Sequence, residues 1–181
     1  MTKQQIIPPV EMAVSIGSAR RAARSSGPAL DAELEEKIRG ITEEVEHKLG
    51  RALITQTWEV TLDYFPVSGE IKLPMAPLES VKTVKFYDAT GVLRTLSPQD
   101  YLVDTKSAPG WLLPAPGCAW PATQSRVNAV EVQYTCGYGP TEGSVPPAIK
   151  EYIVGVIENY YYPNPNAQYL ARRLDRFMVY G

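Results

Sequence analysis

The sequence predicts an α+β fold, in which a small helical bundle body carries a mostly antiparallel β module inserted between its second and third main helices. An acidic amphipathic helix ends at Gly50, the hydrophobic period then changes from about 3.6 residues to two, and helical periodicity returns only at Pro146. We therefore expect three regions. Residues 1–28 form an N-terminal arm and a first helix, residues 29–50 plus 145–181 form the helical body with a C-terminal tail, and residues 51–144 form the inserted β module.

The N-terminal region begins with a polar stretch. Residues 1–10 contain Pro8 and Pro9, which lack an amide donor, so we expect an extended arm. Residues 11–24 place apolar side chains on one side and predict a first helix, which Gly17 weakens. Residues 25–28 read Ser-Ser-Gly-Pro and end it.

A second helix is predicted over residues 31–49. Its apolar residues recur every three or four positions and form one stripe: Leu30, Leu34, Ile38, Ile41, Val45 and Leu49. Asp31 and Glu33 suit the positive N-terminal end of a helix, and Lys48 suits the negative C-terminal end. Gly50 adopts a positive φ without a Cβ clash, so it is the natural residue after the last turn.

The β module begins with residues 54–65, which alternate strongly between apolar and polar side chains. Trp58, Val60, Leu62 and Tyr64 share one face of the predicted strand. Further short strands are expected at 70–73, 81–87, 92–96, 101–103, 111–113 and 129–135, with a four-residue hairpin turn at 88–91. The pattern indicates a meander-like, mostly antiparallel module.

The chain returns to helix at Pro146, because proline is tolerated in the first helical turn. The buried stripe of this third helix contains Ile149, Ile153, Val156, Ile157 and Tyr160. Residues 163–166 read Pro-Asn-Pro-Asn and stop it, and residues 167–176 predict a last short helix. The tail, residues 177–181, is apolar, and so small a body has little left to cover it.

Composition excludes several classes of protein. The 181 residues have a net charge of −2, no apolar run that would span a membrane and no secretory signal. The only cysteines are Cys118 and Cys136; free thiols are the commoner state in a protein made in the cytosol, and a bridge between them stays open.

No catalytic or metal-binding set is evident, so we predict a protein that is not an enzyme and has no cofactor. His47 is the only histidine, which removes nearly every catalytic triad and multi-histidine metal site. The sequence around Gly137 and Gly139 lacks the lysine of a phosphate-binding loop. The acidic residues of helix 31–49 lie opposite its apolar stripe, where nothing would desolvate them.

Several aromatic residues have two interpretations. Trp58 lies in phase with Val60 and is assigned to the core, whereas Trp111 and Trp120 are either packed or form a sugar-binding platform. The three tyrosines at 160–162 cannot all face inward on one helix. Exposed apolar residues beside arginines, as in these tyrosines and the C-terminal tail, suggest a subunit contact; a frayed terminus is the alternative.

An ordered series of short motifs resembles one family. The series is Leu49-Gly50-Arg51-Ala52-Leu53-Ile54-Thr55-Gln56-Thr57-Trp58, Glu70-Ile71-Lys72-Leu73-Pro74, Pro77-Leu78-Glu79-Ser80-Val81, Phe86-Tyr87-Asp88 with Gly91, Tyr101-Leu102-Val103-Asp104, Trp120-Pro121, Ala129-Val130-Glu131-Val132, Cys136-Gly137-Tyr138-Gly139 and Val145-Pro146-Pro147-Ala148-Ile149. From about residue 29 onward the chain resembles the head–tail connector (adaptor) proteins of tailed bacteriophages and phage-derived gene transfer agents. The first 28 residues depart from the family pattern.

The resemblance implies a structural subunit of the virion neck, made in the host bacterial cytoplasm. Such adaptors form a homo-oligomeric ring, usually of twelve copies, that binds the portal protein above and the stopper, head-completion or tail protein below. DNA passes through the ring without sequence-specific binding, no membrane is involved, and the isolated chain can be monomeric because the portal can act as template. Portal docking by the C-terminal segment maps onto Arg172, Arg173, Leu174, Arg176, Phe177, Met178, Val179 and Tyr180.

The acidic side of helix 31–49 is the second candidate surface. Glu35, Glu36, Glu43 and Glu44 form a candidate subunit or channel face, where negative charge would limit sticking of passing DNA; a solvated helix face is the alternative. Two rival functions remain: a β-rich carbohydrate- or protein-binding module of a phage particle, and a hydrolase, for which the spacing offers no convergent carboxylates.

Overall fold

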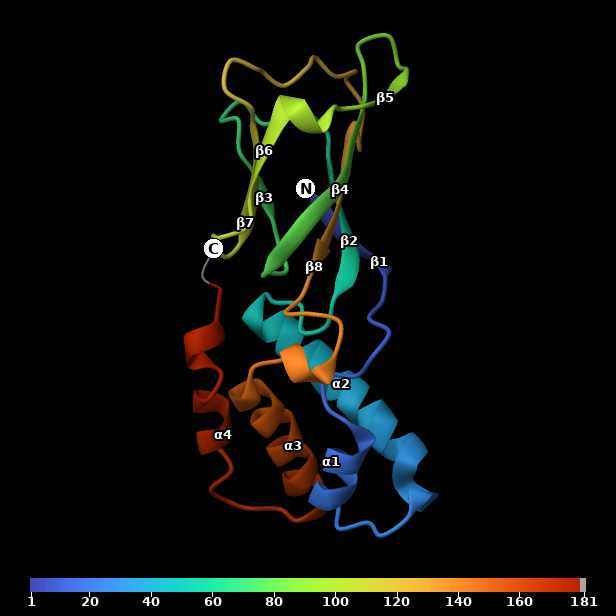
Figure 1. Cartoon of the computed structure of the whole chain (residues 1–181), viewed down its shortest axis with the longest axis vertical. Helices are drawn as coiled ribbons and strands as arrows, with labels where there is room; N and C mark the ends of the chain where they lie inside the picture. Colours follow the sequence, from blue (N-terminus) through green and yellow to red (C-terminus); the bar gives the residue numbers. More distant parts are fainter. Residues whose placement is uncertain (180–181) are drawn as a thin grey trace. The chain divides into compact units, whose positions relative to one another are not determined.

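The computed structural model describes residues 1–179, and these residues form two compact units (Figure 1). The β unit contains Met1–Pro8 and Gln56–Gly137, and the helical unit contains Pro9–Thr55 and residues 138–179. The predicted α+β class is confirmed: helices and two antiparallel sheets are both present. Residues 1–28 are divided between the units, because the first eight residues belong to the β unit and the rest to the helical unit.

The larger sheet of the β unit has five antiparallel strands. In spatial order these are β1 (Thr2–Ile7), β2 (Gln56–Leu62), β8 (Val130–Cys136), β4 (Leu78–Tyr87) and β5 (Leu93–Thr95). Strand β8 joins the sheet between β2 and β4 although it comes last in the chain, so the order is not a simple meander. Asp88 and Gly91 form the predicted hairpin turn, in which the Gly91 amide donates to the Asp88 carbonyl over 2.8 Å.

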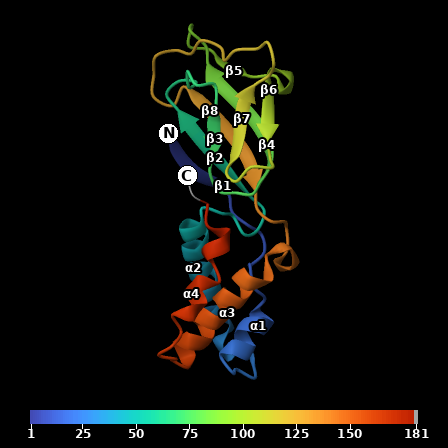
Figure 2. The same cartoon turned by 90° about the vertical axis from the view of Figure 1, so that its left-hand side faces the viewer.

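A second, three-stranded sheet lies against one face of the larger one (Figure 2). Its order is β3 (Ile71–Leu73), β7 (Gly110–Pro114) and β6 (Tyr101–Asp104). Apolar side chains from both sheets fill the space between them, including Val60, Val132, Ile71 and Leu112, which are all fully buried. Tyr134 connects the layers: its buried hydroxyl donates to the carbonyl of Pro74 over 2.8 Å, and burial raises its pKa.

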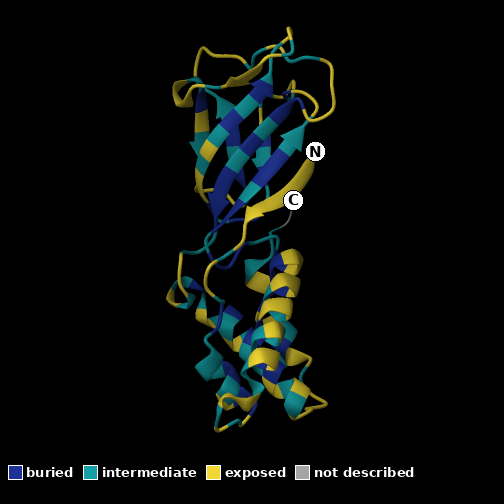
Figure 3. Ribbon diagram, turned by 90° about the vertical axis from the view of Figure 1, so that its right-hand side faces the viewer, coloured by how far each residue is buried: buried dark blue, intermediate teal, exposed yellow. Residues whose placement is uncertain are grey.

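The N-terminal arm is more ordered than the sequence indicates. Instead of a free extended arm, Thr2–Ile7 is the edge strand β1, paired with β2 and exposed along its whole length (Figure 3). Residues that are exposed on both faces do not alternate in hydrophobicity, so the usual signal of a strand is missing here.

The helical unit contains α1 (Ile16–Ala22), α2 (Asp31–Leu49), α3 (Pro147–Tyr161) and the one-turn helix α4 (Tyr169–Arg172). Helix α2 has the predicted bounds, and Gly50 follows it with φ +64°. Helix α1 is shorter than the predicted 11–24, and the predicted last helix is reduced to α4 and the 3₁₀ turn Asp175–Phe177. The core of the unit consists of fully buried residues from α1, α2 and α3: Ala19, Leu34, Ile38, Leu49, Ile149, Ile153 and Ile157.

Candidate assembly surfaces

The C-terminal tail is attached to the end of α2 within the helical unit. The Val179 amide donates to the Leu49 carbonyl over 3.1 Å, and Arg51 Nε donates to the Phe177 carbonyl over 2.5 Å. Phe177 and Met178 pack, partly buried, against the helical core. The expectation that the body has little left to cover the tail is therefore wrong for residues 177–179. Tyr180 lies outside the described residues.

The predicted docking residues differ in what they can offer a partner. Arg172 and Arg176 are exposed, and the Arg176 guanidinium lies 4.7 Å from the Phe177 ring centre. Arg173 is ion-paired with Glu151 of α3. Leu174 is fully buried in the helical core, so it can support docking only by holding its neighbours in place. Arg172 and Arg176 are thus the exposed arginines of this surface that no ion pair within the chain occupies among the described contacts.

The acidic residues of α2 do not form one uniform face. Glu36, Glu43 and Glu44 are exposed, whereas Glu35 is half-buried. Glu46, which the sequence pattern groups with them, is buried, and its Oε1 accepts a hydrogen bond of 2.7 Å from the Leu53 amide. The period of an amphipathic helix predicts which side a residue is on, but it does not reveal that the following loop folds back over Glu46.

The three tyrosines at the end of α3 each have a partner within the helical unit. Lys37 Nζ lies 3.3 Å from the ring centre of Tyr160, and the Arg24 guanidinium lies 4.1 Å from that of Tyr162. The Tyr161 hydroxyl donates to Glu33 over 2.8 Å, and burial together with that carboxylate raises the pKa of Tyr161 to about 12. These contacts join α3 to α1 and α2, so the tyrosines have a structural role whatever else binds them.

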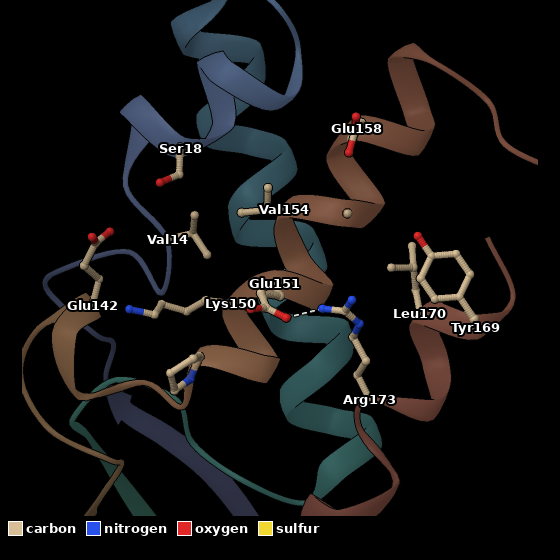
Figure 4. A pocket seen from close by; sticks show the side chains of 12 residues that line it. Val14, Ser18, Glu142, Lys150, Glu151, Val154, Glu158, Tyr169, Leu170 and Arg173 are labelled. Carbon is tan, nitrogen blue, oxygen red and sulfur yellow. Dashed lines mark hydrogen bonds and ion pairs between the residues drawn. The ribbon is translucent and has the colours of Figure 1, made fainter.

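A groove of about 380 Å³ runs along α3 in the helical unit (Figure 4). Its apolar lining includes Val14, Val154 and Leu170, and the Arg173–Glu151 ion pair lies at its edge. Gly155 makes the close approach of α4 feasible, since a Cβ at this position would lie 2.9 Å from Leu170 Cδ2. The mixed charges of Glu142, Lys150 and Glu158 do not indicate a particular ligand.

The β unit has a second hollow, of about 450 Å³, lined by aromatic and proline residues near Trp120. Trp120 stacks on Phe65 with ring centres 4.8 Å apart, and its indole N–H donates to the Gly69 carbonyl over 3.0 Å. Trp111 is on β7, opposite Lys72 and Asp104, and does not line this hollow. The two tryptophans therefore do not form the shared platform that the sugar-binding alternative requires.

The cysteines and the histidine are the remaining side chains that could take part in chemistry. Cys118 is exposed and Cys136 is buried in β8, and no disulfide joins them, so the bridge that the sequence left open is absent. His47 is exposed on α2. Across residues 1–179, no group of three or more His, Cys, Asp or Glu side chains is arranged to hold a metal ion. In the same part of the chain, every helix is too short or too polar for a membrane span.

The perturbed carboxyl groups belong to turns and helix contacts. The pKa of Asp31 is lowered by its hydrogen bonds from Arg20, one of which joins Nε and Oδ1 over 2.7 Å. Hydrogen bonds from Thr90, Arg94 and the Val92 amide lower the pKa of Asp88 at the hairpin turn. These shifts are explained by local structure and indicate no acid–base chemistry.

Comparison with known proteins supports the fold over the full length of the chain. Neither a protein-family model nor a curated protein sequence matches. Among solved structures, the neck of an empty gene transfer agent (GTA) particle computed with C6 symmetry is similar at TM-score 0.83 and 18% identity. The virion of a native GTA particle is similar at TM-score 0.82 and 19% identity, and the neck of a native GTA particle computed with C12 symmetry at 0.74 and 17%. Each match covers 100% of this chain and 97% of the other. The resemblance seen in the sequence is thus confirmed at the level of the fold, which is that of chains found in the virion and neck of gene transfer agent particles.

Proposed function

We propose that the chain is a structural subunit of the neck of a phage-like particle: a head–tail connector (adaptor) that forms a ring between the portal and the stopper or tail. The observation that carries the proposal is the full-length match to neck chains, which includes both the helical and the β elements. Symmetry of C6 and C12 in those structures supports a closed ring of identical subunits, in which one surface contacts a different surface of the next copy.

The similarity to structural components of a particle supports a non-enzymatic role. Two charge features suit the proposed position. The exposed Arg172 and Arg176 offer cationic contacts for docking to a portal, and the exposed Glu36, Glu43 and Glu44 offer a surface that repels DNA. DNA then passes without being held by the phosphate contacts that produce tight nonspecific binding.

The first test is electron microscopy of the purified chain, alone and after mixing with the portal protein of the same particle. A ring bound coaxially to the portal is the expected result. A chain that stays monomeric with portal, and is absent from purified particles by mass spectrometry, would refute the proposal.

Docking is tested with the double variant R172E/R176E, because both side chains are exposed and their reversal leaves the core intact. Truncation before Leu174 is a poorer test, since it removes a fully buried side chain. We expect the variant to fold normally and to lose portal binding. Reversal of Arg126, which is exposed in the β unit, is the matched control and should leave portal binding unchanged.

A further inference from the structure

The side chains of the edge strand β1 are exposed, but its backbone provides the hydrogen-bonding partner for the outer edge of β2. All six residues of β1 are exposed, including Ile6 and Ile7. Its neighbour β2 is covered on both faces: Thr57 and Glu59 are buried on one side and Val60 on the other. The backbone groups along the outer edge of β2 therefore depend on whatever strand lies beside it.

Specific side-chain contacts fix the register of that strand. Gln4 Nε2 donates to Glu59 Oε1 over 3.1 Å, while Gln133 of β8 donates to the other carboxylate oxygen over 2.8 Å. Gln5 donates to the buried Gln56, and Lys3 Nζ lies 5.5 Å from the centre of the Trp58 ring. Loss of β1 would remove one of these two hydrogen bonds to the Glu59 carboxylate.

The connection that follows β1 is suited to exchange between chains. Pro8 and Pro9 have no amide donor, so pairing ends there, and the chain leaves the β unit between them. Residues 8 to 15 contain no helix or strand, and Val10 is almost fully exposed. Beyond its pairing with β2, β1 contacts Met75 through Lys3 Nζ, which lies 3.5 Å from Met75 Sδ. The connection is anchored in the helical unit at Ala13 and Val14, which are both buried.

We infer that β1 is an exchangeable strand: in the assembled ring it pairs with β2 of a neighbouring copy and so links adjacent subunits. The contacts made by Gln4, Gln5 and Lys3 would be the same in both arrangements, so exchange costs no side-chain interactions and is favoured by the high local concentration of subunits in a ring. The inference rests on the proposed ring for the identity of the partner.

Disulfide trapping between two different chains tests the inference directly. Thr2 lies opposite Thr61 in the ladder, at a separation that a disulfide can span. One preparation carries T2C and a second carries T61C, both with the exposed Cys118 changed to serine. Neither chain alone can form this bridge. The control replaces T61C by T95C on β5, the exposed strand at the other edge of the same sheet.

After assembly on portal and mild oxidation, about half of the chains in an equal T2C and T61C mixture should shift from the monomer to the dimer position on a denaturing gel, because about half of the neighbours in a randomly mixed ring carry the complementary cysteine. The T2C and T95C mixture should stay monomeric. Rings that are visible by electron microscopy but yield no dimers, while a single chain with both T2C and T61C crosslinks internally, would overturn strand exchange and leave the proposed function standing.

Failure to form a ring with portal would instead refute the proposed function, and the same mixture then tests exchange by itself. The two chains are refolded together from denaturant at high concentration and oxidised. Covalent dimers in this sample support an exchangeable strand, and monomers alone overturn it.

Discussion

Replacement of Glu46 by alanine tests whether its carboxylate stabilises the turn that follows α2. Both Glu46 and Leu53 are buried, and the Leu53 amide donates to Glu46 Oε1 over 2.7 Å. The alanine variant leaves a buried N–H without an acceptor, which costs about 1–3 kcal/mol of unfolding free energy. For a chain of this size, about 2 kcal/mol lowers Tm by roughly 4–8 °C.

The control variant is Glu44→Ala on the same helix. Glu44 is exposed, and this substitution changes helix propensity and removes a carboxylate near the helix C-terminus just as the Glu46 variant does. The difference between the two variants therefore reports the loss of the buried Glu46 carboxylate, including its hydrogen bond from the Leu53 amide. Glu46→Gln retains an acceptor oxygen and should fall between the control and the alanine variant.

Thermal unfolding followed by circular dichroism measures the difference in Tm, and hydrogen exchange reports the bond itself. A loss of about 2 kcal/mol corresponds to roughly 30-fold faster exchange of the Leu53 amide if opening is local. Equal Tm values for the Glu46 and Glu44 variants, with unchanged protection of Leu53, would refute the role assigned to Glu46.

Three further substitutions have a predicted effect on the free energy of unfolding. Gly40→Ala should raise stability by about 1 kcal/mol in chemical denaturation, because Gly40 is exposed within α2 and a Cβ there meets nothing within 4 Å; a neutral or destabilising result would contradict this. Gly110→Ala should lower stability by about 1–3 kcal/mol, because its Cβ would lie 2.6 Å from Leu78 Cβ; a wild-type melting curve would show that β7 and β4 do not pack as described. Asp31→Asn should destabilise the protein at neutral pH, and the difference from wild type should vanish in acid. Because the pKa of Asp31 is lowered in the folded protein, its contribution to stability is fully present above the ordinary aspartate pKa, roughly 4. This contribution is lost as the pH falls through the lower folded value. A difference in denaturant titrations that does not change with pH would argue against the Arg20 contact.

The sequence is most informative where a segment has one buried face. Helix α2 has the predicted bounds because its stripe of Leu34, Ile38 and Val45 repeats at helical spacing and Gly50 ends it. The turn at Asp88 follows from local residue preferences. In these segments the information that determines the structure lies within a few neighbouring residues.

Prediction fails where the determining contact is distant in sequence. Strand β1 is ordered by pairing with residues fifty or more positions away, and its own side chains carry no alternation. Glu46 is buried by a loop that follows the helix. The tail is attached through Arg51 to Phe177, a contact across 126 positions that no local pattern reveals. Among the candidate site residues, Leu174 is the clearest case: the family resemblance assigned it to the docking surface, and the structure buries it in the helical core.

The β unit enters and leaves the helical part of the chain at adjacent points. Within the β unit, Gln56 at the start of β2 is the register partner of Cys136 at the end of β8. Within the helical unit, the Thr55 amide donates to the Gly139 carbonyl over 2.9 Å, and the Tyr138 amide donates to the Leu53 carbonyl over 3.3 Å. The inserted segment Gln56–Gly137 thus has two ends that meet, so its loops can lengthen while the spacing of its attachment points stays constant, provided that β2 keeps the edge that pairs with β1. If a component that contacts this segment changes, the loops of the segment can change with it while the helices that carry it stay the same.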